Sequence, residues 1–279
     1  MNREANPALT DDAVLGGRLR LLQPRRGHRV GHDAILLAAA TFARPGELAV
    51  DLGAGVGAAG LALACRCPGA SVRLIEIDPA LAALAGENAA RNGLSDRVSA
   101  HALDVLAPPA AFAAAELADG CADRVLTNPP FNDPARQQAS PDAARRAAHM
   151  AGPEMLAAWI ATAARLLRDG GVLTLIHRAD ALAEVVTALS GGFDAIAVLP
   201  VHPRPEAAAI RILVRATKGR QATKSRQATK SGQATGSRPS SPTVLPGLAL
   251  NGADGRPSAA AEAVLRAAGE LPLVRFGDG

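Results

Sequence analysis

Aromatic residues are scarce in this 279-residue chain, which has no tyrosine, one tryptophan and five phenylalanines. A surface of several aromatic rings that stack on bases, as in RRM domains, is therefore not available. The chain also has no apolar run close to the ~20 residues of a membrane-spanning helix, and its N-terminus has no apolar signal-like segment. These absences predict a soluble, cytoplasmic protein with no membrane partner.

Cysteine is scarce as well. Cys65, Cys67 and Cys121 are an odd number without disulfide-like spacing, which is typical of a reducing compartment. Cys65 and Cys67 lack the second pair of ligands that a zinc site needs. No histidine spacing indicates a metal either, so we expect no metal site.

Acidic residues are absent from residues 217–238, whereas six basic residues lie there. The rest of the chain has 24 basic and 26 acidic residues, so the net charge of +4 originates in this segment. Residues 214–237 form a hexapeptide repeat, VRATKG, RQATKS, RQATKS and GQATGS, which is too short and too polar to bury a core. We expect the segment to be disordered. Two explanations of the segment remain open. It is either the product of replication slippage in a surface loop or a tail that contacts RNA phosphates.

Strand and helix patterns alternate from residue 48 onwards. The expected strands are 48–52, 72–77, 98–103, 123–127, 172–177, 195–201 and 209–216. Helices are expected between them, which indicates a largely parallel sheet covered on both faces. The last two strands are joined by a turn too short for a crossover helix, so they must be antiparallel. The predicted fold class is α/β, a Rossmann-like, seven-stranded doubly wound sheet with an antiparallel last strand.

Four segments make up the expected domain organisation. They are a polar N-terminal arm (1–17), the main domain (18–216), the basic low-complexity insert (217–243) and a C-terminal strand and helix that pack on the main domain (244–279). Near the start of the main domain, we expect a helix over 33–42 that is capped by the Asp33 side chain.

A glycine-rich loop, DLGAGVG, follows the first central strand at residues 51–57. Residues 55–60 also match GxGxxG, so an NAD(P)-dependent oxidoreductase is one alternative, and a tight turn without ligand is another. A pyrophosphate prefers free helix N-terminal amides without a nearby anion, whereas Asp51 at the strand end suits a cation. S-adenosylmethionine carries a sulfonium and an ammonium group. Asp51 can neutralise these charges, while Gly53 and Gly55 let the backbone approach the ligand.

Two more carboxylates follow strands. Glu76 ends the next strand in LIEID, where it can accept hydrogen bonds from both hydroxyls of a ribose. Asp78 points to the same face but precedes Pro79, so it is expected to be a helix N-cap instead. Asp104 in HALDV can accept from an adenine amino group, or it can be a solvated carboxylate at a strand end.

The tetrapeptide Asn128-Pro129-Pro130-Phe131 follows the apolar residues Val125 and Leu126. Asn-Pro and Pro-Pro also occur in ordinary turns, but this turn falls where a doubly wound sheet binds its ligand. The Asn128 amide oxygen and the Pro129 carbonyl can hold both hydrogens of one planar NH2 group, while the Phe131 ring stacks on its plane. Asn128 is also expected to contact the cofactor. These interactions strengthen as the lone pair of the nitrogen becomes exposed, and they favour N-methylation without a metal or a strong base.

These residues resemble a known family when they are taken in order. The matching elements are HRVGHDAILLAAA (28–40), the glycine loop, IEID (75–78), NPPF (128–131) and ASPDAARRAAH (139–149). In this order they resemble bacterial tRNA1(Val) adenine-37 N6-methyltransferases, over about residues 13–217 and more loosely 244–272. The resemblance implies that Asp33 and its helix close over the methionine end of the cofactor. Family members often have Thr at the position of His32 and Tyr at that of Phe131, so the hydroxyl contacts of those side chains are absent here.

The resemblance implies a class I S-adenosylmethionine-dependent methyltransferase that acts on adenine N6 in tRNA or another structured RNA. Guanine-N2 methyltransferases of ribosomal RNA and release factor glutamine-N5 methyltransferases share the NPPF-type motif. The first usually have a duplicated domain and the second a helical N-terminal domain. Thirty residues precede the GHDAILLAA element, so we expect no helical N-terminal domain, and no duplicated domain is recognisable in the sequence. Both functions remain alternatives.

Overall fold

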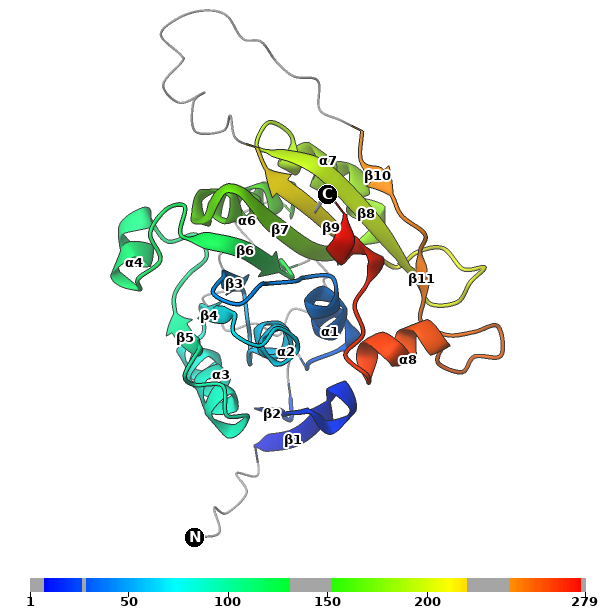
Figure 1. The fold of residues 1–279 in the computed structure, drawn as a ribbon, viewed down its shortest axis with the longest axis horizontal. Helices are drawn as coiled ribbons and strands as arrows, with labels where there is room; N and C mark the ends of the chain where they lie inside the picture. The colour runs from blue at the N-terminus through cyan, green and yellow to red at the C-terminus, as the bar shows by residue number, and fades with distance from the viewer. Residues whose placement is uncertain (1–7, 27–28, 131–151, 220–240, 277–279) are drawn as a thin grey trace, which may run out of the picture.

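The computed structural model describes residues 8–26, 29–130, 152–219 and 241–276. A mixed nine-stranded sheet forms the centre, in the order β10-β8-β9-β7-β6-β3-β4-β5, with β11 also paired to β8 (Figure 1). Its strands are β3 (Leu48–Leu52), β4 (Ser71–Glu76), β5 (Val98–Ala102), β6 (Ala122–Thr127), β7 (Leu167–Arg178), β8 (Phe193–His202), β9 (Arg211–Lys218), β10 (Thr243–Val244) and β11 (Leu248–Ala249). All seven expected strands are present, and the α/β prediction is confirmed.

The antiparallel strand lies inside the sheet. Strands β3 to β7 are parallel to one another, whereas β9 runs antiparallel between β7 and β8. The short connection between β8 and β9 permits only this hairpin, as expected. β10 and β11 then pair in parallel with the other side of β8. They cover an edge that would otherwise present unpaired backbone groups.

Helices cover both faces of the sheet. One core contains residues of α1 (His32–Ala39), α2 (Ala58–Arg66) and α3 (Pro79–Arg91). The other contains residues of α4 (Pro109–Ala114), α6 (Gly152–Leu166) and α7 (Leu182–Leu189). Most connections are crossovers that begin at the carboxyl end of one strand and return to the amino end of the next. The loops that follow the parallel strands therefore meet at a single edge. No helix in the described ranges is long and apolar enough to cross a membrane.

The N-terminal region differs from the expected polar arm. Residues Leu9–Val14 form β1, which pairs antiparallel with β2 (Leu19–Pro24) through the 3-10 turn η1 (Leu15–Gly17). Two adjacent acidic residues suggest a loop, but side chains alternate across a strand. Asp11 therefore meets Arg20 and Arg91, whereas Asp12 meets Arg29. We call β1, η1 and β2 the N-terminal hairpin.

Asparagine side chains join this hairpin to α3. The fully buried Asn88 accepts from Leu22 N–H at 2.8 Å and donates to the Leu22 carbonyl at 2.9 Å and the Val56 carbonyl at 3.0 Å. One turn later, Asn92 forms the same pair of bonds with the backbone of Arg20. The side chains of Asn88 and Asn92 thus satisfy backbone N–H and C=O groups of β2, as a neighbouring strand would. Asn88 also holds the glycine loop in place.

Asn88→Ala is expected to destabilise the fold by about 2–4 kcal/mol, because the buried Val56 carbonyl and the partly buried backbone groups of Leu22 lose their partner. Asn92→Ala is the control: Asn92 is only half-buried, so water can replace its bonds and the loss is smaller. Urea denaturation of both variants measures the difference. Equal decreases in the free energy of unfolding of the two variants would show that the burial of Asn88 does not add to the stability of the hairpin.

The C-terminal segment lies against the main domain. Its helix α8 (Ala259–Leu265) contacts α1 and the N-terminal hairpin, and its 3-10 turn η5 (Pro272–Arg275) contacts β8 (Figure 1). Leu271 N–H donates to the Ala39 carbonyl at the end of α1. The expected start of the insert at residue 217 is too early, because β9 continues to Lys218, whose ammonium donates to the Leu167 carbonyl. Residues 220–240 of the insert lie outside the described residues.

Candidate active site

Four of the expected site residues lie where adjacent parallel strands end. Asp51 lies in β3 and Glu76 ends β4, while Asp104 and Asn128 follow β5 and β6. Leu52 of β3 pairs with Ile75 of β4 and Thr127 of β6. We call this edge, where the parallel strands end, the catalytic edge.

Asp51 is a buried carboxylate, with 2% of its surface exposed. Its Oδ2 accepts a hydrogen bond from Gly60 N–H at 2.8 Å, in the first half of α2. Burial raises the pKa of Asp51 to about 7, and the nearby charge of Glu76 adds to this shift. No arginine or lysine of the described chain is among the groups that act on the Asp51 carboxylate. The site therefore favours a cationic ligand.

The amides of the glycine loop are already bonded within the protein. Gly53 and Ala54 N–H both donate to the Ile75 carbonyl at 2.9 Å, and Gly55 N–H donates to Glu76 Oε2 at 2.8 Å. Glu76 Oε1 accepts from Asp78 N–H at 2.9 Å. A pyrophosphate would need such amides free and would meet carboxylates instead. The loop therefore does not suit a dinucleotide, despite its GxGxxG pattern.

The remaining loop and strand-end residues have distinct positions. Gly55 has a positive φ of 56°, and a Cβ on it would meet nothing within 4 Å, so a ligand can approach its backbone there. Asp78 caps α3 by accepting from the amides of Ala80 and Leu81, which confirms the expected N-cap. Asp104 Oδ1 accepts from Leu106 N–H at 2.9 Å.

Asn128 presents an unsatisfied acceptor. It follows Thr127, whose hydroxyl donates to the Leu52 carbonyl at 2.9 Å and fixes the end of β6 to β3. The Oδ1 atom of Asn128 is buried and accepts no hydrogen bond from the described residues. Pro129 is buried and Pro130 is exposed. A buried oxygen without a donor is costly, so this position is suited to an N–H group of a ligand. Phe131 and His149 lie outside the described residues.

Asp33 does not cap its helix. The N-cap of α1 is Gly31, which offers no side chain, and Asp33 lies within the first turn. Its Oδ2 accepts from Arg211 Nε at 2.9 Å, at the start of β9. The capping prediction was wrong because a basic residue 178 positions away competes for this carboxylate. This ion pair holds the N-terminus of α1 at the catalytic edge.

A comparison with known protein families agrees with the fold and with the residues at these strand ends. The model of the methyltransferase small domain matches residues 33–200, which is more than half of the chain. The chain belongs to this family. The expected relationship to methyltransferases and the expected cofactor, S-adenosylmethionine, are confirmed at the level of the family.

Individual relatives carry different names. A tRNA1(Val) (adenine(37)-N6)-methyltransferase of Porphyromonas gingivalis is 34% identical over 56% of this chain and 61% of its own length. A release factor glutamine methyltransferase of Mycolicibacterium smegmatis is 40% identical over 50% of this chain and 49% of its own length. The chain thus spans only about half to three fifths of these relatives.

A solved structure supports the fold over a longer range. A predicted O-methyltransferase, protein Atu636 from Agrobacterium tumefaciens, superposes with a TM-score of 0.64 and 27% identity. The match covers 83% of this chain and 94% of that protein. The similarity therefore extends beyond the family domain.

Trp159 belongs to this methyltransferase site but did not stand out in the sequence. It lies in α6, and its ring packs against Gly53, where an added Cβ would lie 2.6 Å from Trp159 Cη2. It is the only tryptophan of the chain. Its spacing within an amphipathic helix resembles that of any core residue. The same contact makes its fluorescence a reporter for binding at the loop.

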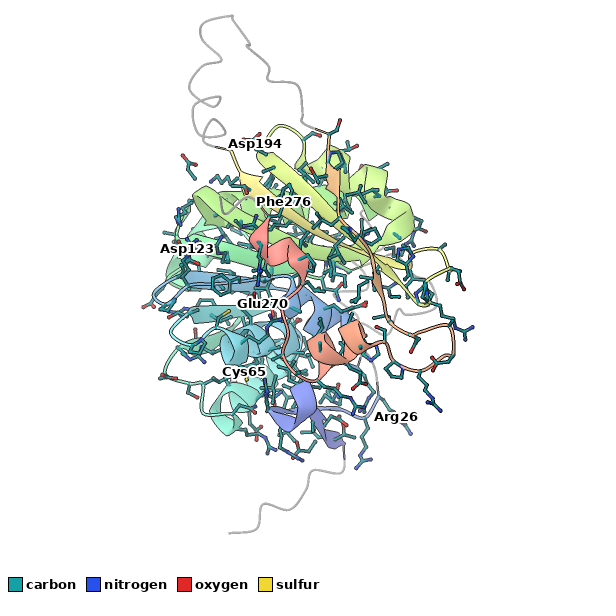
Figure 2. The ribbon with its side chains drawn as sticks, turned by 45° about the vertical axis from the view of Figure 1, so that its right-hand side comes forward. Arg26, Cys65, Asp123, Asp194, Glu270 and Phe276 are labelled. Carbon is teal, nitrogen blue, oxygen red and sulfur yellow. The ribbon has the colours of Figure 1, made fainter. Side chains whose placement is uncertain are left out.

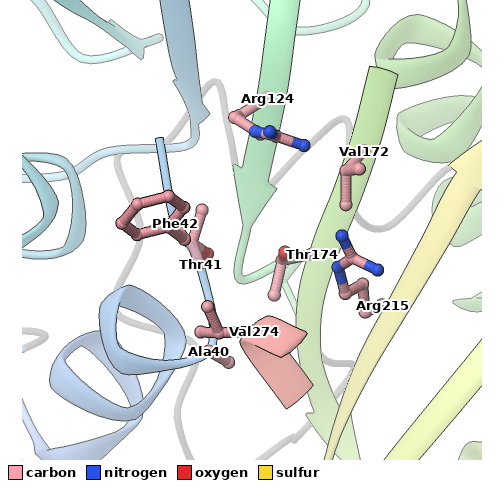
Figure 3. A pocket seen from close by; sticks show the side chains of 8 residues that line it. All are labelled: Ala40, Thr41, Phe42, Arg124, Val172, Thr174, Arg215 and Val274. Carbon is pink, nitrogen blue, oxygen red and sulfur yellow. The ribbon is translucent and has the colours of Figure 1, made fainter. Parts of the chain in front are cut away.

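A small polar cavity lies elsewhere in this methyltransferase domain. It has a volume of about 10 Å³, enough for about one water molecule. Its walls come from the end of α1, β6, β7, β9 and η5, and they include Arg124 and Arg215 (Figure 3). Arg124 forms a bidentate pair with Glu47, with both N–O distances near 3 Å. None of the expected site residues lines this cavity.

Proposed function

We propose that this protein transfers a methyl group from S-adenosylmethionine to an exocyclic nucleobase nitrogen, namely N6 of an adenine in tRNA. The observation that carries this proposal is the buried Oδ1 of Asn128, which has no donor in the described chain. It lies one residue beyond β6, beside the loop that follows β3. An acceptor at this point is satisfied by a hydrogen-bond donor of the substrate, and a planar NH2 group supplies one.

The carboxylates of the site suit this cofactor. Asp51 is buried without a cation and complements the positive charges of the methionine moiety. Glu76 lies beside the open backbone of Gly55, so its oxygens can take the ribose hydroxyls. Gly55 leaves its backbone open to a ligand, whereas the Trp159 ring covers Gly53, which was expected to be open as well. Asp104 accepts from the adenine amino group, and Asp33 lies where α1 meets the edge.

The chain supplies orientation rather than acid or base chemistry. Bound S-adenosylmethionine would supply an electrophilic methyl group, with S-adenosylhomocysteine as the leaving group and the surplus proton of the amine released to solvent after the transfer. Asn128 Oδ1 and the Pro129 carbonyl accept the two hydrogens of the target amine, and they direct its lone pair towards that methyl group. Phe131 is proposed to stack on the base plane, which contributes about 1–3 kcal/mol. The bonds to the amine strengthen as positive charge develops on its nitrogen, which is how they accelerate the reaction.

Glutamine is the second candidate acceptor. A glutamine side chain offers the same planar NH2, and the release factor glutamine methyltransferase of M. smegmatis supports this alternative. Guanine N2 offers a third such group. Support for adenine comes from the sequence of residues 28–40, which includes α1, and from the P. gingivalis relative. NAD(P) chemistry is disfavoured because the loop amides are already bonded.

Nucleoside mass spectrometry tests the acceptor. Purified protein, S-adenosylmethionine and unmodified tRNA are expected to yield N6-methyladenosine, with no methylglutamine in a release factor supplied as competitor. N2-methylguanosine or methylglutamine as the product would replace the proposed acceptor. Calorimetry with S-adenosylmethionine and with NAD tests the cofactor, because binding of NAD alone would contradict a methyltransferase.

A further inference from the structure

Positive charge on the folded domain is concentrated in the N-terminal hairpin and the residues that follow it. Residues 8–31 contain five arginines and two aspartates. The rest of the chain outside the insert (217–238) has 19 basic and 24 acidic residues. The hairpin region is therefore a basic element on an otherwise acidic domain.

The hairpin is fixed to the cofactor loop. The side chain of Asn88 bonds to both backbone groups of Leu22 in β2 and to the Val56 carbonyl in the glycine loop. Gln23 Oε1 accepts from Val30 N–H at 2.9 Å, just before α1. The charges of the hairpin are thus held in a constant position relative to the catalytic edge.

Two arginines of this region have no partner in the described chain. Arg20 and Arg29 form ion pairs with Asp11 and Asp12. Arg25 and Arg26, which follow Pro24 at the end of β2, are exposed and form no ion pair or side-chain hydrogen bond with described residues. Figure 2 shows Arg26 at the outer surface of the molecule. Cationic side chains without an acidic neighbour are available to an anionic partner.

Arg25 and Arg26 lie on the same side of the molecule as Asn128. The chain passes from Arg26 to the N-terminus of α1, where Asp33 pairs with Arg211. Arg211 begins β9, and because β9 is antiparallel to β7, its first residue lies at the carboxyl end of β7. That end belongs to the catalytic edge. Gln23, two residues before Arg25, accepts from Val30 N–H just before α1, so the arginines follow a point of the chain that is held beside the helix joined to this edge.

The basic insert begins at the opposite edge. Lys218, the last residue of β9, pairs with Phe193 at the start of β8, and Thr243 pairs with Ala197. Both ends of residues 219–242 therefore lie towards the amino ends of the parallel strands, away from Asn128. The hairpin, rather than the insert, presents its charge beside the site.

We propose that Arg25 and Arg26 bind the phosphate backbone of the RNA substrate and position it at the catalytic edge. This inference rests on the proposed RNA methyltransferase function. Phosphate contacts orient a nucleic acid without reading its sequence. The arginines would thus set affinity and register, while the residues from Asn128 onwards select the NH2 group.

The double variant Arg25→Gln/Arg26→Gln tests this proposal, with tRNA affinity measured between 50 and 200 mM salt. Each lost phosphate contact should lower the slope of log K against log salt by about 0.7–0.9, and affinity at 100 mM salt should fall at least tenfold. The kcat at saturating tRNA and the affinity for S-adenosylmethionine, followed by Trp159 fluorescence, should stay unchanged. Urea denaturation of the variant checks its stability.

Two further proteins serve as controls. Arg44→Gln/Arg168→Gln removes two charges at the amino edge of the sheet, where these side chains are 58% and 50% exposed, and it should bind tRNA as the wild type does. Deletion of residues 220–240 removes most charges of the insert and should leave the slope unchanged.

Two results would overturn the assignment. In the first, the hairpin variant keeps the wild-type slope. In the second, only the deletion flattens it, which would place the phosphate contacts in the insert. Failure of the proposed function looks different, because the wild-type protein itself would then neither bind nor methylate tRNA.

Discussion

Replacing Asn128 with alanine is expected to lower kcat by roughly a hundred- to a thousandfold, the usual effect of removing one preorganised polar group from a transition state. The affinity for S-adenosylmethionine should change little, because Asn128 Oδ1 faces the acceptor in the proposed complex. Steady-state methylation of tRNA measures kcat, and Trp159 fluorescence measures cofactor binding. The fold should tolerate the change, since this oxygen has no partner to lose in the described chain.

Asn128→Asp is the matched variant. A carboxylate keeps an acceptor oxygen at the same position and should retain clearly more activity than alanine does. If the alanine variant keeps the wild-type kcat, Asn128 is not part of the catalytic site. If both variants lose cofactor binding equally, the residue serves the cofactor and not the amine.

Asp51→Asn is expected to weaken S-adenosylmethionine binding by at least about a hundredfold. One ion pair at about 4 Å amounts to roughly 4 kcal/mol at the effective dielectric of a protein site, and 1.4 kcal/mol corresponds to a factor of ten. The asparagine keeps an acceptor for Gly60 N–H, so the loop should stay in place. Calorimetry or Trp159 fluorescence measures the affinity.

The same substitution should change the pH dependence. Because burial raises the pKa of Asp51 to about 7, the site must lose a proton before it can neutralise the cofactor. Wild-type affinity should therefore fall by up to about tenfold for each pH unit below this value. The Asp51→Asn variant should lack this dependence. A wild-type affinity that is constant between pH 5.5 and 8 would contradict the assignment.

Stability without cofactor should change in the opposite direction. The pKa of Asp51 is about 7 in the folded protein and near 3.8 in the unfolded chain, so only the folded state keeps the proton between these values. Its contribution to stability is complete below pH 3.8 and is lost as the pH rises towards 7. Asp51→Asn removes a buried charge and should raise the melting temperature at pH 8 but not at pH 4. Calorimetric melting of the wild type and the variant without ligand, at pH 4 and at pH 8, measures this difference.

The sheet was predictable because local patterns carry most of its information. Short apolar strands alternate with helical segments, and the tight turn between β8 and β9 allows only an antiparallel pair. The N-cap role of Asp78 was equally local, since Asp78 and Pro79 both act within the first turn of α3. The strands β10 and β11 were not separated in the prediction. Each has two residues, and their pairing with β8 defines them.

The first strand of the hairpin, β1, and the role of Asp33 were mispredicted for one common reason, whereas a short strand over residues 19–23 was expected and is present as β2. The polar side chains of β1 and Asp33 have partners far away in the sequence: Asp11 pairs with Arg91, and Asp33 pairs with Arg211. A sequence pattern shows that a charged residue is present. It does not show whether the fold brings an oppositely charged residue into contact with it. The importance of Asn88 escaped notice for the same reason, because its partners Leu22 and Val56 are 66 and 32 positions away.

The sequence by itself determined the alternating α/β plan, the glycine loop and the type of chemistry that an Asn-Pro-Pro turn allows. These depend on residues within a few positions of one another, whose propensities and turn geometry act locally. Only the tertiary structure decided that Asp51 is buried, that Asn128 Oδ1 accepts no hydrogen bond from the described residues, and that Arg25 and Arg26 are exposed and form no ion pair with them. Burial, desolvation and charge pairing depend on which distant segments the fold brings into contact.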